Sequence, residues 1–239
     1  MLKSNYILSF SFLIASSVLC LNTAVASVTL GGTRFIYHES QDSLSISAYD
    51  RDNIPYLVQS WFSPYNEKTD KKINSNLAKI PFVVTPPLFR MNPGDTNTIN
   101  IVKTDTSTLP QDRESIFYFN FKAIPGLAKS SSSSLMVSVS SSMKLFYRPE
   151  KLTDEEAASA WEKIVFTKHG KSVTIKNPTP YFVTLHKLSI DSQANSSVKN
   201  LMVSPFSEKS IPVTTSVHSV NWSALTDQGG ITSEKSTTL

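Results

Sequence analysis

Residues 135–147 read LMVSVSSSMKLFY, and this stretch decides the fold class. Leu135, Val137 and Val139 alternate with Ser138 and Ser140, and alternation of apolar and polar residues with a period of two is typical of a β-strand. Its thirteen residues also exceed the usual length of a strand in a globular protein. The stretch therefore predicts one long β-strand with an apolar face and a face of small hydroxyls.

Two roles fit such a strand. In the simpler one, which the residues by themselves favour, the apolar row covers the core of its own domain. In the other, the segment is an edge strand whose unpaired main chain and alternate side chains bind an extended segment of another protein. The pattern alone leaves both roles open.

Working outward from this strand, the chain before residue 148 contains further short segments rich in β-branched and aromatic residues, with turn residues between them. The predicted strands cover residues 29–38, 44–49, 56–62, 82–85, 98–103, 116–123 and 135–147. Seven strands is the count of a constant-type immunoglobulin sandwich. The Pro86-Pro87 pair predicts a rigid turn and leaves the cis or trans state of Pro87 open.

The strand pattern stops at residues 148–152, which read RPEKL. Thr153 and Glu156 then form a capping-box pattern, which predicts a short helix through about residue 163. A second, shorter set of predicted strands follows at residues 173–176, 181–190, 201–203, 209–213 and 217–222. We therefore predict an all-β protein with two immunoglobulin-like β-sandwich domains, residues 27–149 and 150–239.

The first 26 residues are typical of a secretory signal. Lys3 gives the positive start, residues 6–21 are largely apolar, and Ala24-Val25-Ala26 has the small-x-small pattern of a cleavage site, which predicts cleavage after Ala26. Serines interrupt the apolar stretch and no basic stop-transfer flank follows, so we expect no stable membrane insertion. Cleavage removes Cys20, the only cysteine, and leaves an exported protein without a disulfide.

The polar residues do not predict a catalytic site. The four histidines are scattered through both halves without metal-ligand spacing: His38, His169, His186 and His218. No nucleophile elbow, phosphate-binding loop or zinc-protease pattern occurs. The basic cluster at residues 68–72 has no interleaved aromatic residues, which argues against nucleic acid. We therefore expect a binding protein, not an enzyme, with no metal and no cofactor.

Several motifs occur in a specific order and spacing. They are TRFIY at 33–37, YLVQSW at 56–61, PFVVTPPLFR at 81–90, LPQDRES at 109–115 and KLFYRP at 144–149, followed by NPTPYFV at 177–183 and DQGG at 227–230. Together they resemble the PapD-like periplasmic pilus chaperones. The resemblance is dense from about residue 28 to 149 and thinner in the second half.

The resemblance implies a boomerang of two sandwiches whose cleft receives the end of a pilus subunit. The two cleft cations of the family correspond to Arg34 and Lys144, which would bind the terminal carboxylate of the subunit. A guanidinium offers a carboxylate two parallel hydrogen bonds and an ammonium adds a point charge. The alternative for either cation is an ion pair with an acid of its own chain.

The resemblance also implies that the subunit lacks its last strand and that the chaperone lends one. Leu135, Val137 and Val139 would then fill the groove of the subunit. Lys144 has the opposite parity to these three residues, so if all face the subunit the strand must twist, or must bulge within residues 140–142.

Glu114, Arg148 and Asp227 occupy the motif positions of an ionic network between the two domains. Surface salt bridges stabilise a fold little. We therefore expect this trio to set the angle of the cleft without being a source of stability.

The implied partners are pilus or fimbrial subunits and an outer-membrane usher, in the periplasm. Self-association through exposed edge strands is a further option. The strongest alternative is a secreted β-sandwich pilin or adhesin subunit, which shares the signal and the β-rich composition. Such subunits usually carry an alternating extension at the mature N-terminus and often a cysteine pair, and this chain shows neither.

Overall fold

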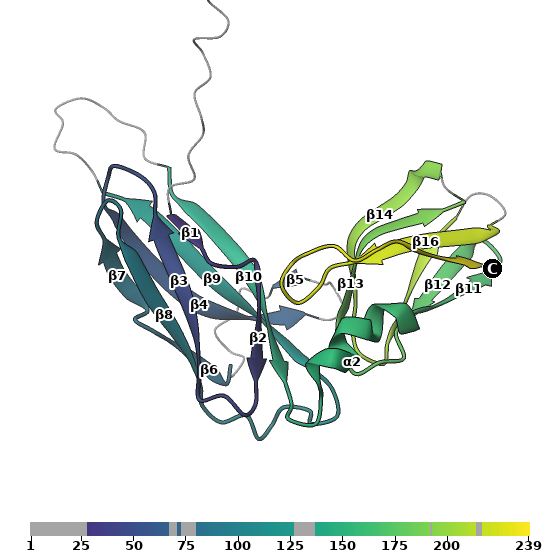
Figure 1. Ribbon diagram of the computed structural model, residues 1–239, viewed down its shortest axis with the longest axis horizontal. Coiled ribbons are helices and arrows are strands. Elements are labelled where there is room, and N and C mark those ends of the chain that lie inside the picture. Colours follow the sequence, from purple (N-terminus) through teal and green to yellow (C-terminus); the bar gives the residue numbers. More distant parts are fainter. Residues whose placement is uncertain (1–27, 67–70, 73–79, 127–136, 192, 214–216) are drawn as a thin grey trace, which may run out of the picture.

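The computed structural model describes residues 28–66, 71–72, 80–126, 137–191, 193–213 and 217–239. They form two β-sandwich lobes that meet at an angle, with a short helix near the junction (Figure 1). The predicted all-β boomerang of two sandwiches is therefore confirmed. The predicted signal segment lies outside the described residues.

The N-terminal lobe consists of two sheets. One has the strand order β1-β3-β8-β6, and the other has the order β2-β10-β9-β4, with β7 and β5 also paired to β4. The bounds are β1 Val28–Leu30, β2 Arg34–His38, β3 Ser43–Asp50, β4 Tyr56–Asn66, β5 Lys71–Lys72, β6 Phe82–Thr85, β7 Leu88–Met91, β8 Thr96–Lys103, β9 Ser115–Pro125 and β10 Val139–Arg148. Apolar side chains from both sheets meet between them, including the fully buried Tyr37, Val58, Ile99, Phe119 and Leu145.

The single strand predicted over residues 29–38 is wrong, because the chain changes sheets within it. β1 pairs antiparallel with β3, whereas β2 pairs parallel with β10 in the opposite sheet. Gly31 and Gly32 lie at the crossing, and a Cβ atom at Gly32 would come within 2.9 Å of the Phe35 ring. The crossing places Arg34 at the start of a strand beside β10.

The predicted strand over residues 135–147 is shorter than expected at its start. β10 begins at Val139; Val137 precedes it without strand pairing, and Leu135 lies outside the described residues. The register between β9 and β10 is unbroken from the Val139–Ala123 pair to the Tyr147–Ser115 pair. Of the two alternatives for residues 140–142, a twist or a bulge, the unbroken register with β9 excludes the bulge.

Pro86 and Pro87 separate two short strands, β6 and β7. The peptide bond before Pro86 is cis, and Pro87 is trans. The sequence reading missed β7, which follows directly and pairs with β4.

The C-terminal lobe has a three-stranded sheet of order β11-β12-β15 and a four-stranded sheet of order β14-β13-β16-β17. Its elements are α2 Asp154–Ser159, a 3-10 turn η1 Ala160–Lys163, β11 Val165–His169, β12 Ser172–Lys176, β13 Val183–Ile190, β14 Gln193–Val203, β15 Glu208–Pro212, β16 Ser219–Ala224 and β17 Lys235–Thr238. A second core lies between the sheets, around Val173, Leu185, Leu188 and Trp222. The sequence reading missed β11 and β17.

The helix begins where the sequence predicts. Thr153 Oγ1 accepts the backbone N–H of Glu156 over 3.2 Å, which is one half of the capping box. The Glu156 carboxylate instead accepts the hydroxyl of Tyr181 over 3.0 Å. The helix is thereby fixed to the start of the C-terminal sheet.

Within the described part of the chain, no helix is long and apolar enough to cross a membrane. The same residues contain no group of three or more side chains arranged to hold a metal ion.

Candidate functional site

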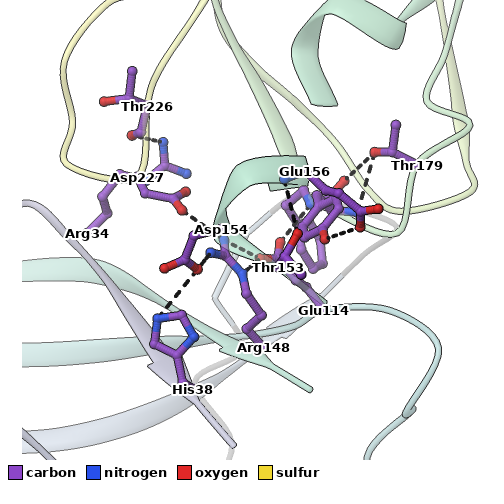
Figure 2. Close-up of polar contacts among 12 residues, drawn as sticks. Arg34, His38, Glu114, Arg148, Thr153, Asp154, Glu156, Thr179, Thr226 and Asp227 are labelled. Carbon is purple, nitrogen blue, oxygen red and sulfur yellow. Dashed lines mark hydrogen bonds and ion pairs between the residues drawn. The ribbon is translucent and has the colours of Figure 1, made fainter. Parts of the chain in front are cut away.

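A buried ionic network lies where the lobes meet (Figure 2). Arg148, at the end of β10, donates from Nε and Nη2 to Glu114 Oε1 over 2.9 and 2.7 Å, and from Nη2 to Asp227 Oδ2 over 2.8 Å. Its Nη1 donates to Asp154, the first residue of α2. Glu114 Oε2 accepts the N–H of Phe182 over 2.9 Å. The network joins the N-terminal lobe to three segments of the C-terminal lobe.

The centre of the network is shielded from water, whereas the Asp227 and Asp154 side chains are 29% and 68% exposed. The side chains of Arg148 and Glu114 are only 1% and 2% exposed. Burial alone lowers the pKa of Arg148, but the carboxylates of Glu114 and Asp227 raise it above its ordinary value. Burial raises the pKa of Glu114, against the opposing effects of Arg148 and the Phe182 N–H. The three donors on its oxygens favour the ionised form of Glu114 and so oppose the effect of burial.

The structure brings together all three residues predicted for the interdomain network, but corrects their setting. They were expected to form surface salt bridges, whereas Arg148 and Glu114 are buried. The sequence reading also missed Asp154, because an acid in the first turn of a helix has a simpler explanation in the helix dipole. His38 Nε2 lies 3.6 Å from the same Asp154 carboxylate.

Arg34 and Lys144 lie side by side in the same cleft. They are direct partners in the parallel register of β2 and β10. Both line a pocket of about 270 Å³ whose walls come from both lobes, with Tyr118 on the N-terminal side and Thr184 and Leu225 on the C-terminal side. Two strands of one sheet thus present two cations to one interdomain pocket.

The Arg34 guanidinium is partly buried and held by the C-terminal lobe. Its Nη1 donates to the backbone carbonyls of Thr226 over 3.0 Å and of Leu225 over 3.4 Å. Its Cζ lies 4.8 Å from the centre of the Phe146 ring. Burial lowers the pKa of Arg34, opposed by the charge of Asp227. Among the described residues Arg34 forms no ion pair. The structure therefore does not support the alternative in which an acid of the same chain pairs with Arg34.

Lys144 contacts the opposite wall of the cleft. Its Nζ donates to the sulfur of Met202 over 3.3 Å, and a thioether is a weak acceptor. A carboxylate would be a stronger acceptor than this sulfur.

The segment predicted to be lent to a partner has an exposed apolar row. Val137 and Val139 are 66% and 57% exposed. In the described residues β2 pairs only with positions 144–148 of β10, so positions 139–143 pair with β9 alone and leave an open edge. Residues 143, 145 and 147, which share the parity of Val139, are buried in the N-terminal core. The apolar row therefore continues the core face beyond the end of the core.

A small apolar cluster also joins the lobes, and the sequence reading did not identify it. Phe146 and Ile116 from the N-terminal lobe pack with Phe182 and Met202 from the C-terminal lobe. The available signal was the run of three apolar residues at 145–147, since a strand with both faces buried loses its alternation.

Comparison with family models places both lobes in one family. The model described as pili and flagellar-assembly chaperone, PapD N-terminal domain, matches residues 27–153. The model described as pili assembly chaperone PapD, C-terminal domain, matches residues 159–236. The two matches together cover almost the whole of the described structure.

Curated relatives and solved structures agree with these matches. The chain is 35% identical over 214 residues to the chaperone protein FimC of Escherichia coli K12, covering 87% of this chain and 83% of that protein. It is 36% identical over 218 residues to the chaperone protein PmfD of Proteus mirabilis, covering 87% and 82%. The Escherichia coli chaperone DraB has a similar structure, with a TM-score of 0.71 and 30% identity over 89% of this chain and 98% of that one.

A further solved structure is the complex of the Salmonella enterica pilin SafA with the chaperone SafB. The match has a TM-score of 0.73 and 27% identity, covering 91% of this chain and 98% of the other. These relatives are named as chaperones, which decides against the alternative of a pilin or adhesin subunit. With both lobes matched by the paired family models, the chain belongs to the PapD family of pilus-assembly chaperones.

Proposed function

We propose that this chaperone binds a pilus subunit in the periplasm by anchoring the subunit's terminal carboxylate at Arg34 and Lys144 while lending it the start of β10. One observation carries the proposal. Arg34 and Lys144 line an interdomain pocket, and the open edge of β10 directly precedes Lys144 on that strand. The similar SafB chaperone was solved in complex with a pilin, which supports the class of partner.

The anchor is argued from charge and geometry. Arg34 and Lys144 are neighbours in register, so one carboxylate can reach both. Charge-assisted hydrogen bonds to a carboxylate are about twice as strong as neutral ones, and a pocket between two lobes excludes part of the competing water. The anchor fixes the register of the bound subunit along β10.

The lent strand is argued from its edge and its exposed side chains. An open edge offers main-chain hydrogen bonds to an added strand. Val137 and Val139 are exposed apolar side chains on this edge, and Leu135, outside the described residues, extends their alternation. Each such side chain contributes about 1.5–3 kcal/mol when fully buried in a partner.

The remaining parts of the proposal concern location and transfer. We place the mature chain, cleaved after Ala26, in the periplasm, as for the similar SfaE, a protein described as a periplasmic chaperone. Transfer to an outer-membrane usher would then release the lent strand in exchange for another subunit's extension. This cycle is a binding exchange and needs no enzyme activity.

The test is co-purification from the periplasm. Wild type, Arg34→Ala and Lys144→Ala chains are each co-expressed with the pilin encoded nearest to the gene. Two matched controls remove exposed cations outside the cleft, Arg90→Ala on β7 and Lys176→Ala on β12.

We expect wild type and both control variants to retain the pilin, and both cleft variants to lose it while their circular dichroism and melting temperatures stay close to those of wild type. Retention of the pilin by both folded cleft variants would refute the anchor. Loss of the pilin in the controls as well would show that binding depends on general charge and not on this pocket.

A further inference from the structure

The loop of residues 225–230 extends from the C-terminal lobe onto β2 and contacts two cations at once. The carbonyl of Thr226 accepts Arg34 Nη1 over 3.0 Å. The next residue, Asp227, accepts Arg148 Nη2 over 2.8 Å. Figure 2 shows both contacts. Adjacent residues of one loop thus bind the cation of the proposed anchor and the cation of the buried network.

Internal hydrogen bonds fix the shape of this loop. The Thr226 carbonyl also accepts the N–H of Gly229 over 2.9 Å, and the Thr226 N–H donates to the Gly230 carbonyl over 2.8 Å. Thr226 Oγ1 accepts the N–H of Gly230 over 3.1 Å. The carbonyl that holds Arg34 therefore uses its second acceptor site to close the turn, and its direction is set before any ligand binds.

Gly229 lets the loop approach the strand that carries Arg34. A Cβ atom at this position would lie 2.9 Å from Thr33 Oγ1, too close for a non-bonded contact. Its φ of +84° is also a conformation that favours glycine. Gly170 has a φ of +57°, but a Cβ atom there would meet nothing within 4 Å. Gly170 thus also has a positive φ, but it lacks the close contact of Gly229.

Two groups hold the Arg34 guanidinium. The loop accepts its Nη1 through the Thr226 carbonyl, and the Phe146 ring lies 4.8 Å from the guanidinium carbon. Arg34 Nε remains buried and has no hydrogen-bond partner within the described residues. These two contacts therefore hold the guanidinium in place before a ligand binds.

We propose that residues 225–230 are a positioning loop, which orients Arg34 for the subunit carboxylate and links the Arg148 network to subunit affinity. The inference rests on the proposed function, because it assumes the carboxylate anchor. Fixing a donor in its bound geometry lowers the cost of binding. Arg34 is then correctly placed only while Asp227 keeps the loop, and with it the C-terminal lobe, docked on Arg148.

The test compares two forms of one peptide. A synthetic peptide copying the carboxyl-terminal strand of a pilus subunit is prepared as the free acid and as the amide, and each form is titrated calorimetrically into the mature chain. The ratio of the two affinities measures recognition of the carboxylate. The variants are Gly229→Ala, Gly229→Ala with Thr33→Ala, and Gly170→Ala as the control for backbone strain.

We expect wild type to prefer the free acid. In Gly229→Ala the ratio of the two affinities should fall about tenfold, which corresponds to the loss of one hydrogen bond to a charged group. Gly170→Ala should keep the wild-type ratio. Adding Thr33→Ala to Gly229→Ala should restore most of the ratio, because the clash is with Thr33 Oγ1.

An unchanged ratio in folded Gly229→Ala, or an equal loss of affinity for acid and amide, would overturn the positioning role. Should Gly229→Ala not fold, Asp227→Asn weakens the link to Arg148 and must reduce the ratio as well; an unchanged ratio there also overturns the inference. If wild type shows no preference for the free acid, the carboxylate anchor itself is refuted. This outcome is distinct from failure of the positioning role, in which wild type keeps the preference and the variants do not change it.

Discussion

Arg148 places a full positive charge between two hydrophobic cores. Its side chain is the largest of those fully buried in the described part of the chain, and an isolated buried ion costs several kcal/mol. Glu114, Asp154 and Asp227 offset that cost with direct hydrogen bonds. An intact buried ion pair of this kind need not stabilise the fold. Removing one partner, however, strongly destabilises it, because the other charge stays buried without compensation.

Replacing Glu114 by alanine tests this asymmetry. The change removes two of the hydrogen bonds of Arg148, so Glu114→Ala should lower the free energy of unfolding by about 3–5 kcal/mol, measured by urea denaturation. Asp112→Ala removes an exposed partner of Arg113 and serves as the control, for which we expect little change. Equal effects of the two substitutions would mean that burial does not decide the cost.

Asp191 predicts a dependence of stability on pH. Its Oδ1 accepts the N–H groups of His218 and Ser219, each over 2.8 Å, and these bonds lower the pKa of Asp191 below its ordinary value. Because folding favours the ionised form, the carboxylate stabilises the fold above the unfolded-state pKa of about 3.9. That contribution is lost as the pH falls through the lower pKa of the folded state.

Asp191→Asn keeps an acceptor oxygen and tolerates the left-handed backbone at this position, where φ is +50°. The variant should therefore melt at a lower temperature than wild type at pH 8, and the difference should shrink as the pH falls below about 4. Thermal unfolding followed by circular dichroism between pH 8 and pH 3 measures this. A difference that stays constant over the range would contradict an electrostatic origin.

At the scale of elements, the sequence predicts where most strands lie but not which strands pair. Residues 82–85 form the predicted strand, and the helix begins at its predicted cap. Residues 29–38 look continuous because both β1 and β2 are rich in strand-forming residues, and the change of sheet depends on β3 and β10, which are distant in the sequence. Local propensity carries no information about such partners.

The open part of β10 gives a prediction for the element as a whole. Val139→Asp places a charge in the exposed apolar row, so the chaperone should fold normally but lose the pilin in co-purification. Val165→Asp on β11 is a matched control, because Val165 is 48% exposed and Val139 is 57% exposed. Loss of a side chain that is buried only in the complex costs about 1.5–3 kcal/mol, or roughly ten- to a hundredfold in affinity. Pilin retained by Val139→Asp would exclude this part of the strand from the interface.

At the scale of the molecule, the resemblance identifies Arg34, Lys144, Glu114, Arg148 and Asp227, and the structure places them in two groups at one junction. What the sequence does not predict is their environment. The burial of Glu114, the hydrogen bond from Arg34 to Thr226 and the contact of Gly229 with Thr33 all arise between segments far apart in the chain. Motifs specify residue types, whereas burial depends on how the two lobes dock.

Contacts between the lobes should also decide whether the two lobes unfold together. Phe182 belongs to the C-terminal lobe, yet it packs on Phe146 with ring centres 5.6 Å apart and on Tyr65 at 6.3 Å. Phe166 is a comparable aromatic residue, but it packs inside the C-terminal core on Trp222 at 4.7 Å. Replacing either by alanine should cost about 3–5 kcal/mol, but only one of them lies between the lobes.

Calorimetry should separate these two cases. We expect wild type to unfold in a single transition that both lobes share. Phe166→Ala should do the same at a lower temperature. Phe182→Ala removes contacts between the lobes, so its melting profile should split into two transitions, each with the enthalpy of one lobe. Since the pocket of the proposed anchor has walls from both lobes, the same variant should also bind the subunit more weakly. A single transition in Phe182→Ala would mean that the remaining contacts between the lobes, the Arg148 network among them, are enough to couple them.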